Sequence, residues 1–345
     1  MRFTNKIGIK SAATWLPETV ETIEERIAAG LCDAERGEAM GITEVPVSAD
    51  LAGPEMAVLA GRKALAAADW DPAKIGFLAH ARVFHQGHEK WSYGHFVANG
   101  VGISDRAFPF GIEQLCNGGA AALHLAAAHL IADPDLESAM TTTGERFFAP
   151  VWDRWAQHPC IGYGDGGTAV LLGREARPDD ALHLLALTHS TAHEMESMER
   201  GDNPFSQYPM QHSKTWPTNA QRGEFNDRMG ENHFPDAARR HTQISLDRGL
   251  AEAGLEHDDP RIKYITISRV GPGLQEMMYG PALSTVKAQQ INLGTKTGHM
   301  GAGDLPANLA DLISQDLLAP GEFAIMCSAG GGFTWTTSIV QRPER

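Results

Sequence analysis

The amino-acid sequence contains an internal repeat, which limits the folds that are open to it. Residues 64–83 read ALAAADWDPAKIGFLAHARV, and residues 249–270 read GLAEAGLEHDDPRIKYITISRV. Each segment has the pattern of a helix end, a polar turn with Asp-Pro, and a strand that ends in Arg-Val. Arg82 and Arg269 are therefore equivalent, 187 residues apart. Two repeats are too few for a solenoid, so we expect two similar α/β halves that share one core.

A second pair of segments repeats at nearly the same interval. Cys116-Asn-Gly118 precedes the run GAAALHLAAAHLI, and His299-Met-Gly301 precedes AGDLPANLADLI, 183 residues later. Equivalent turns of duplicated halves meet across a pseudo-twofold axis. The repeat therefore predicts that Cys116 and His299 lie side by side.

The predicted strands indicate sheets that are covered on both faces. Unbroken apolar runs occur at 75–79, 169–172, 264–267 and 323–327, between helical segments. We expect an N-terminal half over residues 1–175 and a C-terminal half over 176–345. The stretch 189–245 is rich in proline, aromatic residues and histidine, which is typical of a substrate-binding insertion or lid. A solvated surface excursion is the alternative.

Composition excludes several classes of protein. The 345 residues carry 29 Lys plus Arg against 43 Asp plus Glu, a net charge of −14. This balance argues against nucleic-acid binding, which needs a basic face. No run approaches the roughly 20 apolar residues of a membrane span, and the first residues lack the pattern of a signal peptide. Four cysteines without CxxC pairs suit a reducing cytoplasm. We expect a cytoplasmic enzyme.

Three residues form a candidate catalytic set. Cys116 is predicted at a helix start, where the helix dipole favours a thiolate. The predicted pairing with His299 is the arrangement of a nucleophile and its base. Asp304 follows His299 by five residues and could orient its imidazole. A buried structural cysteine and an ordinary acidic residue in a first helical turn are the alternatives.

Four motifs together resemble the β-ketoacyl-carrier-protein synthase III family. They are TTTGERF (141–147), GYGDGGTAVLLG (162–173), LCNGG (115–119) and AGGGFTW (329–335). The resemblance implies the thiolase fold, with duplicated βαβαβαββ halves in a five-layer α-β-α-β-α sandwich, and a homodimer. It makes Cys116 the acylated nucleophile, with the amides of Cys116 and Gly331 as oxyanion hole. The donor it implies is an acyl-carrier-protein or coenzyme A thioester, with no further cofactor.

Two departures from the family change the expected reaction. Condensing members carry a His-Gln-Ala-Asn motif where this chain has Ser268-Arg269-Val270-Gly271, and an Asn where it has His299. Those two family residues stabilise the enolate of decarboxylation. Their loss favours a non-decarboxylative acyltransferase that forms an ester on a natural-product hydroxyl. The pattern is similar to synthase-III-like acyltransferases of antibiotic pathways, such as the cervimycin malonyltransferase and the pactamycin 6-methylsalicyltransferase. A decarboxylative synthase III, transfer from coenzyme A to a carrier protein, and a non-catalytic partner subunit are the alternatives.

Weaker signals suggest substrate contacts. His85, Trp91 and Tyr93 are candidates to line an acyl or acceptor channel, as are Trp216 in the insertion and Arg269 if it faces the pocket. A structural role for Arg269, shared with Arg82, is the alternative. The histidines near position 85 lack a cysteine or a suitably spaced acid to complete a zinc site, so no metal is expected. Arginines within 214–248 could bind an acidic carrier protein or coenzyme A phosphates, or simply form a solvated face.

Overall fold

A ten-stranded sheet runs through the computed structural model, which describes residues 2–208, 211 and 219–344. Its strand order is β10-β9-β11-β12-β8-β1-β7-β6-β4-β5. Read outward from the central β8–β1 pair, each side has the same pattern of antiparallel and parallel neighbours. The predicted duplication is therefore visible in the topology, and the predicted boundary after residue 175 lies between β7 and β8.

The first half holds β1 (Arg2–Trp15), β2 (Val20–Thr22), α1 (Ile23–Ala28), α2 (Ala34–Met40), β3 (Glu44–Pro46), α3 (Gly53–Ala68), η1 (Pro72–Lys74), β4 (Ile75–Arg82), α4 (Tyr93–Val101), β5 (Phe108–Glu113), η2 (Leu115–Asn117), α5 (Gly118–Ala132), β6 (Ser138–Glu145) and β7 (Gly166–Gly173). β2 and β3 pair with each other in a small separate sheet. β5, the strand before Cys116, ends at Glu113, and the chain then turns into η2.

The second half holds β8 (Leu182–Thr191), η3 (His193–Met195), α6 (Ser197–Arg200), α7 (Asn219–Met229), α8 (His233–Ala253), β9 (Ile262–Thr266), α9 (Pro272–Leu283), β10 (Gln289–Ile291), η4 (Gly301–Gly303), α10 (Asp304–Ser314), β11 (Phe323–Gly330) and β12 (Thr334–Gln341). The predicted insertion at 189–245 thus includes α6, α7 and the first half of α8.

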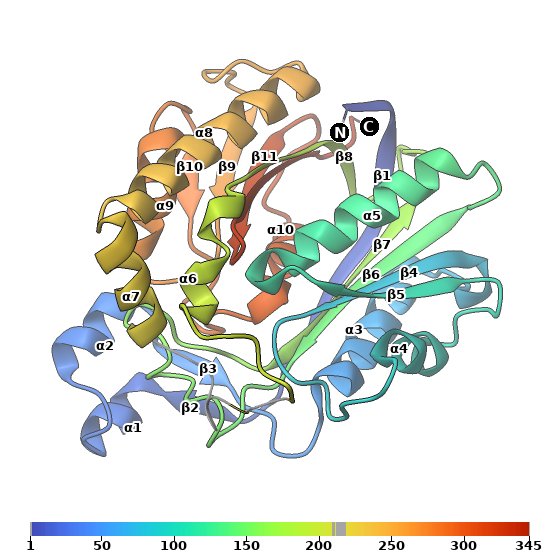
Figure 1. Cartoon of the computed structure of the whole chain (residues 1–345). Helices are drawn as coiled ribbons and strands as arrows, with labels where there is room; N and C mark the ends of the chain where they lie inside the picture. The colour runs from blue at the N-terminus through green and yellow to red at the C-terminus, as the bar shows by residue number, and fades with distance from the viewer. Residues whose placement is uncertain (1, 209–210, 212–218, 345) are drawn as a thin grey trace.

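Helices form three layers around the two halves of the sheet. In Figure 1, α5 and α10 lie in the middle of the molecule, α8 and α9 on one side, and α3 and α4 on the other. The central helices share one apolar core with strands of both halves. α8 and α9 pack on the second half, and α3 and α4 on the first. This is the predicted α-β-α-β-α sandwich.

The central helix α5 carries an apolar sequence because it is a core element. Among the described residues, the segment Leu115–Ala132 is the one helix with the length and composition of a membrane span, and half of it is buried. Leu125 and Ile131 are 37% and 43% exposed, so one face of the helix is open in the single chain.

Candidate active site

Cys116 stands on a sharp turn between β5 and α5. The preceding residue, Leu115, has a φ of +45°, an uncommon conformation for a residue with a side chain. Such a turn projects the thiol away from the strand and places it before the N-terminus of α5. The end of β11 packs onto it so closely that a Cβ on Gly330 would lie 2.4 Å from the amide nitrogen of Asn117. Backbone strain and close approach of this kind concentrate at functional sites.

The turn that carries His299 is held by the GYGDGG motif of the first half. The amide of His299 donates to the carbonyl of Gly162 (2.8 Å), and the amide of Gly164 donates to the carbonyl of His299 (3.1 Å). Gly298 and Gly301, on either side, both have positive φ values, which a side chain would disfavour. The position of the imidazole therefore depends on two segments, the GYGDGG motif and the turn at His299, which are 130 or more residues apart in sequence.

The structure brings Cys116, His299 and Asp304 into one hydrogen-bonded chain. Nε2 of His299 lies 3.0 Å from Sγ of Cys116, and Nδ1 lies 2.6 Å from Oδ2 of Asp304. The carboxylate of Asp304 is itself fixed, because it accepts from the amides of Met300 (2.8 Å) and Arg269 (2.7 Å). His299 and Asp304 are both buried. This is the geometry of nucleophile, base and orienting acid.

Charge determines the protonation of this chain of groups. Burial disfavours the imidazolium, but the negative charges of Asp304 and Cys116 outweigh burial and raise the pKa of His299 well above its usual value. Burial also acts to raise the pKa of Asp304, yet the neighbouring His299 holds that pKa below its usual value. The aspartate therefore stays ionised and stabilises a proton on the imidazole.

Two cavities reach Cys116, and both also touch Gly331 and Tyr163. The first, which we call the His299 cavity, has a volume of about 260 Å³ and includes His299. Its wall is mostly apolar, from Ile161, Met198, Phe234, Val270, Leu274, Met277, Met278 and Phe333. The second, the Trp152 cavity, has a volume of about 340 Å³ and is lined by Val83, Leu115, Trp152, Gln157, Glu196 and Arg200, among others, but not by His299.

Sequence reasoning missed three polar residues of these cavities. His158 lines the His299 cavity, and Glu199 and Arg222 line both. Nη2 of Arg222 donates to Oε1 of Glu199 at 2.8 Å. Arg222 was noted only as part of a basic run. No local motif marks these positions, because folding alone brings 158, 199 and 222 to the same place.

Arg269 does not face the His299 cavity. Its neighbours Ser268 and Val270 line that cavity, whereas its guanidinium is buried on Asn308 (2.9 Å), Thr297 (2.8 Å) and Asp311 (2.5 Å). The suggested substrate contact is therefore corrected in favour of the structural alternative. Its side chain fixes α10, and its backbone amide holds Asp304.

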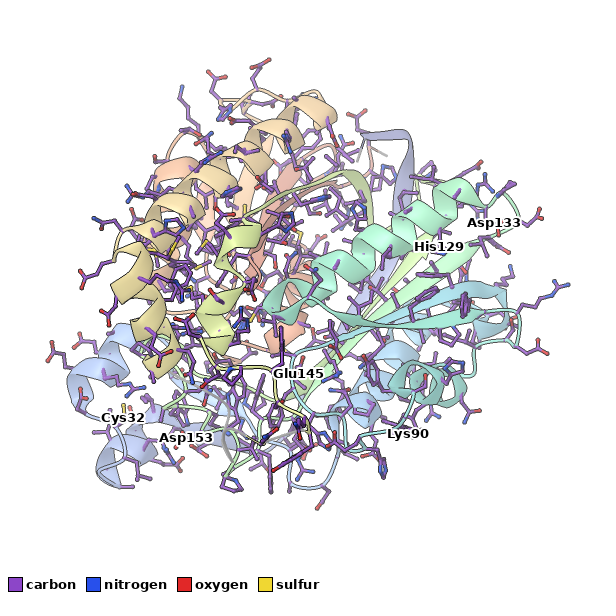
Figure 2. The ribbon with its side chains drawn as sticks, in the orientation of Figure 1. Cys32, Lys90, His129, Asp133, Glu145 and Asp153 are labelled. Atoms are coloured by element: carbon purple, nitrogen blue, oxygen red, sulfur yellow. The ribbon has the colours of Figure 1, made fainter. Side chains whose placement is uncertain are left out.

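The other predicted substrate contacts lie elsewhere. His85 is exposed beside Glu89, and Trp91 and Tyr93 contact His88 and His80. None of the three lines the two cavities around Cys116 within one chain, so their role stays a prediction. Figure 2 shows Lys90, in the same loop, far from the centre of the molecule. Trp216 lies outside the described residues. Among the described residues, no group of three or more His, Cys, Asp or Glu side chains is arranged so that it could hold a metal ion.

The comparisons with known proteins agree with this architecture. Residues 110–190 match the family model of 3-oxoacyl-[acyl-carrier-protein] synthase III, and residues 250–342 match the model of its C-terminal part. The β-ketoacyl-[acyl-carrier-protein] synthase III of Synechocystis is 23% identical over 289 residues, which cover 83% of this chain and 82% of that protein.

Two solved structures extend the comparison to the whole chain. ChlB3, described as an acyltransferase, is 27% identical and superimposes with a TM-score of 0.89, covering 98% of both chains. The synthase III of Pseudomonas aeruginosa shares the fold, with a TM-score of 0.77 at 18% identity and coverage of 98% and 99%.

The fold and these matches define a class of thiolase-fold enzymes that transfer acyl groups. The chain belongs to the ketoacyl synthase III-like members of the thiolase superfamily.

Proposed function

We propose that the protein is a non-decarboxylative acyltransferase that moves an acyl group from a carrier-protein or coenzyme A thioester, through acyl-Cys116, onto a hydroxyl. The hydrogen-bonded chain Cys116–His299–Asp304 carries this proposal. The acceptor is a natural-product molecule of the sugar or cyclitol type, and the product is an ester of secondary metabolism. The enzyme acts in the cytoplasm as a homodimer in the biosynthesis of a polyketide-type antibiotic, without a cofactor beyond its donor.

The first half-reaction loads the enzyme. The Cys116 thiolate attacks the thioester carbonyl, and the amides of Cys116 and Gly331 stabilise the oxyanion. The intermediate collapses as the bond from carbon to the carrier sulfur breaks. The proton on His299 passes to the departing carrier thiolate, which leaves a neutral imidazole beside acyl-Cys116.

The second half-reaction transfers the acyl group. The acceptor hydroxyl attacks the acyl carbon while its proton moves to Nε2 of His299, and Asp304 stabilises the resulting imidazolium. The carbon–sulfur bond to Cys116 then breaks, which releases the ester and restores the thiolate–imidazolium pair. Acylation removes the thiolate charge that raises the pKa of His299, so the acyl-enzyme has a more readily available base than the free enzyme.

The surroundings of residue 268 support transfer without decarboxylation. The hydroxyl of Ser268, which occupies the place of the condensing histidine, is paired with the hydroxyl of Tyr279 at 2.8 Å. Arg269 is committed to Asn308, Thr297 and Asp311. The Arg269 guanidinium is therefore not left to stabilise an enolate, and each such donor is worth about 3–4 kcal/mol in comparable oxyanion sites.

Two mass-spectrometric measurements test the proposal. Mixing with a panel of acyl thioesters should add the acyl mass to the wild type and not to Cys116→Ala. With doubly labelled malonyl thioester and an alcohol, the malonyl group should appear intact in the ester, with little labelled carbon dioxide. Stoichiometric carbon dioxide release with a new carbon–carbon bond would identify the decarboxylative synthase reaction that the curated relatives are named for.

A further inference from the structure

His158 is held on the wall of the His299 cavity by its own turn. Nη2 of Arg36 donates to the carbonyls of His158 (3.3 Å) and Trp155 (2.9 Å), which fixes the backbone. The amide of Cys160 donates to Nδ1 of the His158 ring at 3.1 Å. The ring is therefore anchored through one nitrogen.

This anchoring determines what the other nitrogen can do. Since Nδ1 accepts a hydrogen bond, the proton of the neutral ring is on Nε2. Burial, with the positive charges of Arg222 and His299, lowers the pKa of His158 to about 3, so the ring stays neutral near pH 7. Among the described residues, Nε2 has no hydrogen-bond partner. His158 is thus a fixed neutral donor beside Cys116 and His299, and not a second base.

The arrangement of the two cavities indicates which substrate meets His158. The attacking hydroxyl must reach Nε2 of His299, and only the His299 cavity includes both this residue and Cys116. The acceptor therefore enters the His299 cavity, and the acyl group extends into the Trp152 cavity. His158 belongs to the acceptor side.

The remaining wall of the His299 cavity sets the charge of the acceptor. Apart from the catalytic groups, its only charged side chains among the described residues are Glu199 and Arg222, which are paired with each other. Among the described lining residues outside the catalytic set, no side-chain cation is left unpaired to neutralise a carboxylate or phosphate. Burying an unpaired charge is costly. The bound part of the acceptor is therefore uncharged.

We propose that His158 binds a second, non-reacting oxygen of the acceptor through its Nε2–H, so that the acceptor is an uncharged molecule with at least two oxygen functions. The inference rests on the proposed function. It assigns His158 as the residue that distinguishes a polyol from a simple alcohol, and it gives the mostly apolar cavity one directional contact besides His299.

Two small alcohols and three variants test this role. The full-length enzyme is first loaded with the donor that acylates Cys116. The rate at which glycerol or propan-1-ol removes the acyl group from Cys116 is then measured and divided by the rate at which water hydrolyses the acyl-enzyme of the same variant. Per primary hydroxyl, the wild type should prefer glycerol about three- to tenfold, the value of one neutral hydrogen bond. His158→Asn keeps an acceptor for the Cys160 amide but has no atom at Nε2, and should lose the preference. His158→Gln, which can place a donor near Nε2, should recover part of it.

A control variant and three contrary outcomes separate the role of His158 from the proposed function. His257→Asn changes a surface histidine that contacts Thr285 and Asp247, and should keep the wild-type preference. An equal response of the wild type to both alcohols, or an unchanged preference in His158→Asn, would overturn the role of His158 while transfer itself stands. Failure of both alcohols to form an ester would overturn the proposed function and this inference together. Malonyl decarboxylation that disappears in His158→Asn would assign His158 to an enolate and contradict the inference.

Discussion

At the scale of single residues, His299 must hold a proton in one half-reaction and accept one in the other. Its two ring nitrogens lie 2.6 Å from Asp304 and 3.0 Å from Cys116, so its charge responds to both neighbours. Two of the other cysteines, Cys32 and Cys327, have different environments. Cys32 is at the periphery beside α2 (Figure 2), and burial raises the pKa of Cys327 to about 12, which keeps that thiol protonated.

Replacing Asp304 by Asn should separate orientation from acylation. We expect the transfer rate to fall by about 10²–10⁴, because the amide favours the wrong imidazole tautomer. The loss of a negative charge also lowers the pKa of His299, and the base acts only when neutral. The acidic limb of the pH–rate profile should therefore move to lower pH. Single-turnover transfer from preformed acyl-enzyme across pH measures both effects, with His299→Ala as the reference for a missing base. A profile with an unmoved limb would contradict the electrostatic role of Asp304.

At the scale of elements, the first turn of α5 and the η4 turn of the other half lie in direct contact. A Cβ on Gly119 would lie 2.4 Å from the carbonyl oxygen of Ala302 and 2.7 Å from Cδ of Pro306. Neither backbone nor proline ring can yield without moving the turn that follows His299. The nucleophile and base are therefore held at hydrogen-bond distance by the close packing of two helix starts.

Gly119→Ala should damage both stability and catalysis. We expect overpacking to lower the free energy of unfolding by about 1–3 kcal/mol. We also expect the rate of acyl transfer to fall by a larger factor than the yield of folded protein. Gly273→Ala is the matched control, since Gly273 is also helical and a Cβ at this position would meet no atom within 4 Å. That variant should be as stable as the wild type or gain up to about 1 kcal/mol. Denaturant unfolding and single-turnover transfer provide the comparison; equal behaviour of the two variants would contradict the packing argument.

At the scale of the whole molecule, the sheet ends at β5, which has β4 as its one neighbour among the described strands. Phe108 on this edge strand is 63% exposed, and the open face of α5 follows it in sequence. Edge strands with exposed apolar residues pair readily with another chain. We therefore expect the proposed homodimer to form through β5.

Phe108→Glu should weaken that dimer. Two buried carboxylates at the interface should raise the dissociation constant at least about tenfold. Phe205→Glu is the control, because Phe205 is 92% exposed in another part of the chain. Light scattering over a concentration series measures the mass of each. A wild-type monomer at all concentrations would rule out the dimer, and equal dimerisation of both variants would rule out β5 as its site.

A buried carboxylate links the two halves and should make stability depend on pH. Glu145, near the centre of Figure 2, accepts from the amides of Val83 (2.5 Å), Phe84 (2.9 Å) and Ala302 (3.4 Å). Burial raises its pKa from 4.5 to about 8. Between these values the folded protein keeps a proton that the unfolded chain releases, so the free energy of unfolding falls as pH rises.

Glu145→Gln should remove this contribution. Between about pH 5.5 and 8, the free energy of unfolding should fall more steeply with pH in the wild type than in the variant. A loss of stability that is the same at every pH would not change this difference in slope. Groups common to both proteins, such as His80 with its pKa lowered to about 4 by burial, cancel in the difference. Denaturant titrations at several pH values give the two slopes. Parallel curves would contradict a raised pKa at Glu145.

The duplicated α/β architecture and the pairing of Cys116 with His299 could be predicted from the amino-acid sequence. Both follow from local signals that recur at a fixed interval, and a repeat places equivalent turns together whatever the remaining side chains do. The contact of Asp304 with His299 could also be predicted, because the two residues are only five positions apart in sequence.

The acceptor side of the site and the role of Arg269 depend on packing between distant segments and could not be predicted. His158, Glu199 and Arg222 come from separate loops and helices, and their meeting in one cavity depends on how these pack. Arg269 lies in the turn after β9, and the sequence does not show to which side of that turn its side chain points. Its partners Asn308, Thr297 and Asp311, which hold it away from the substrate, lie 28 or more residues away in sequence. Local patterns predict which elements form, whereas the direction of a side chain and its partners depend on residues distant in sequence.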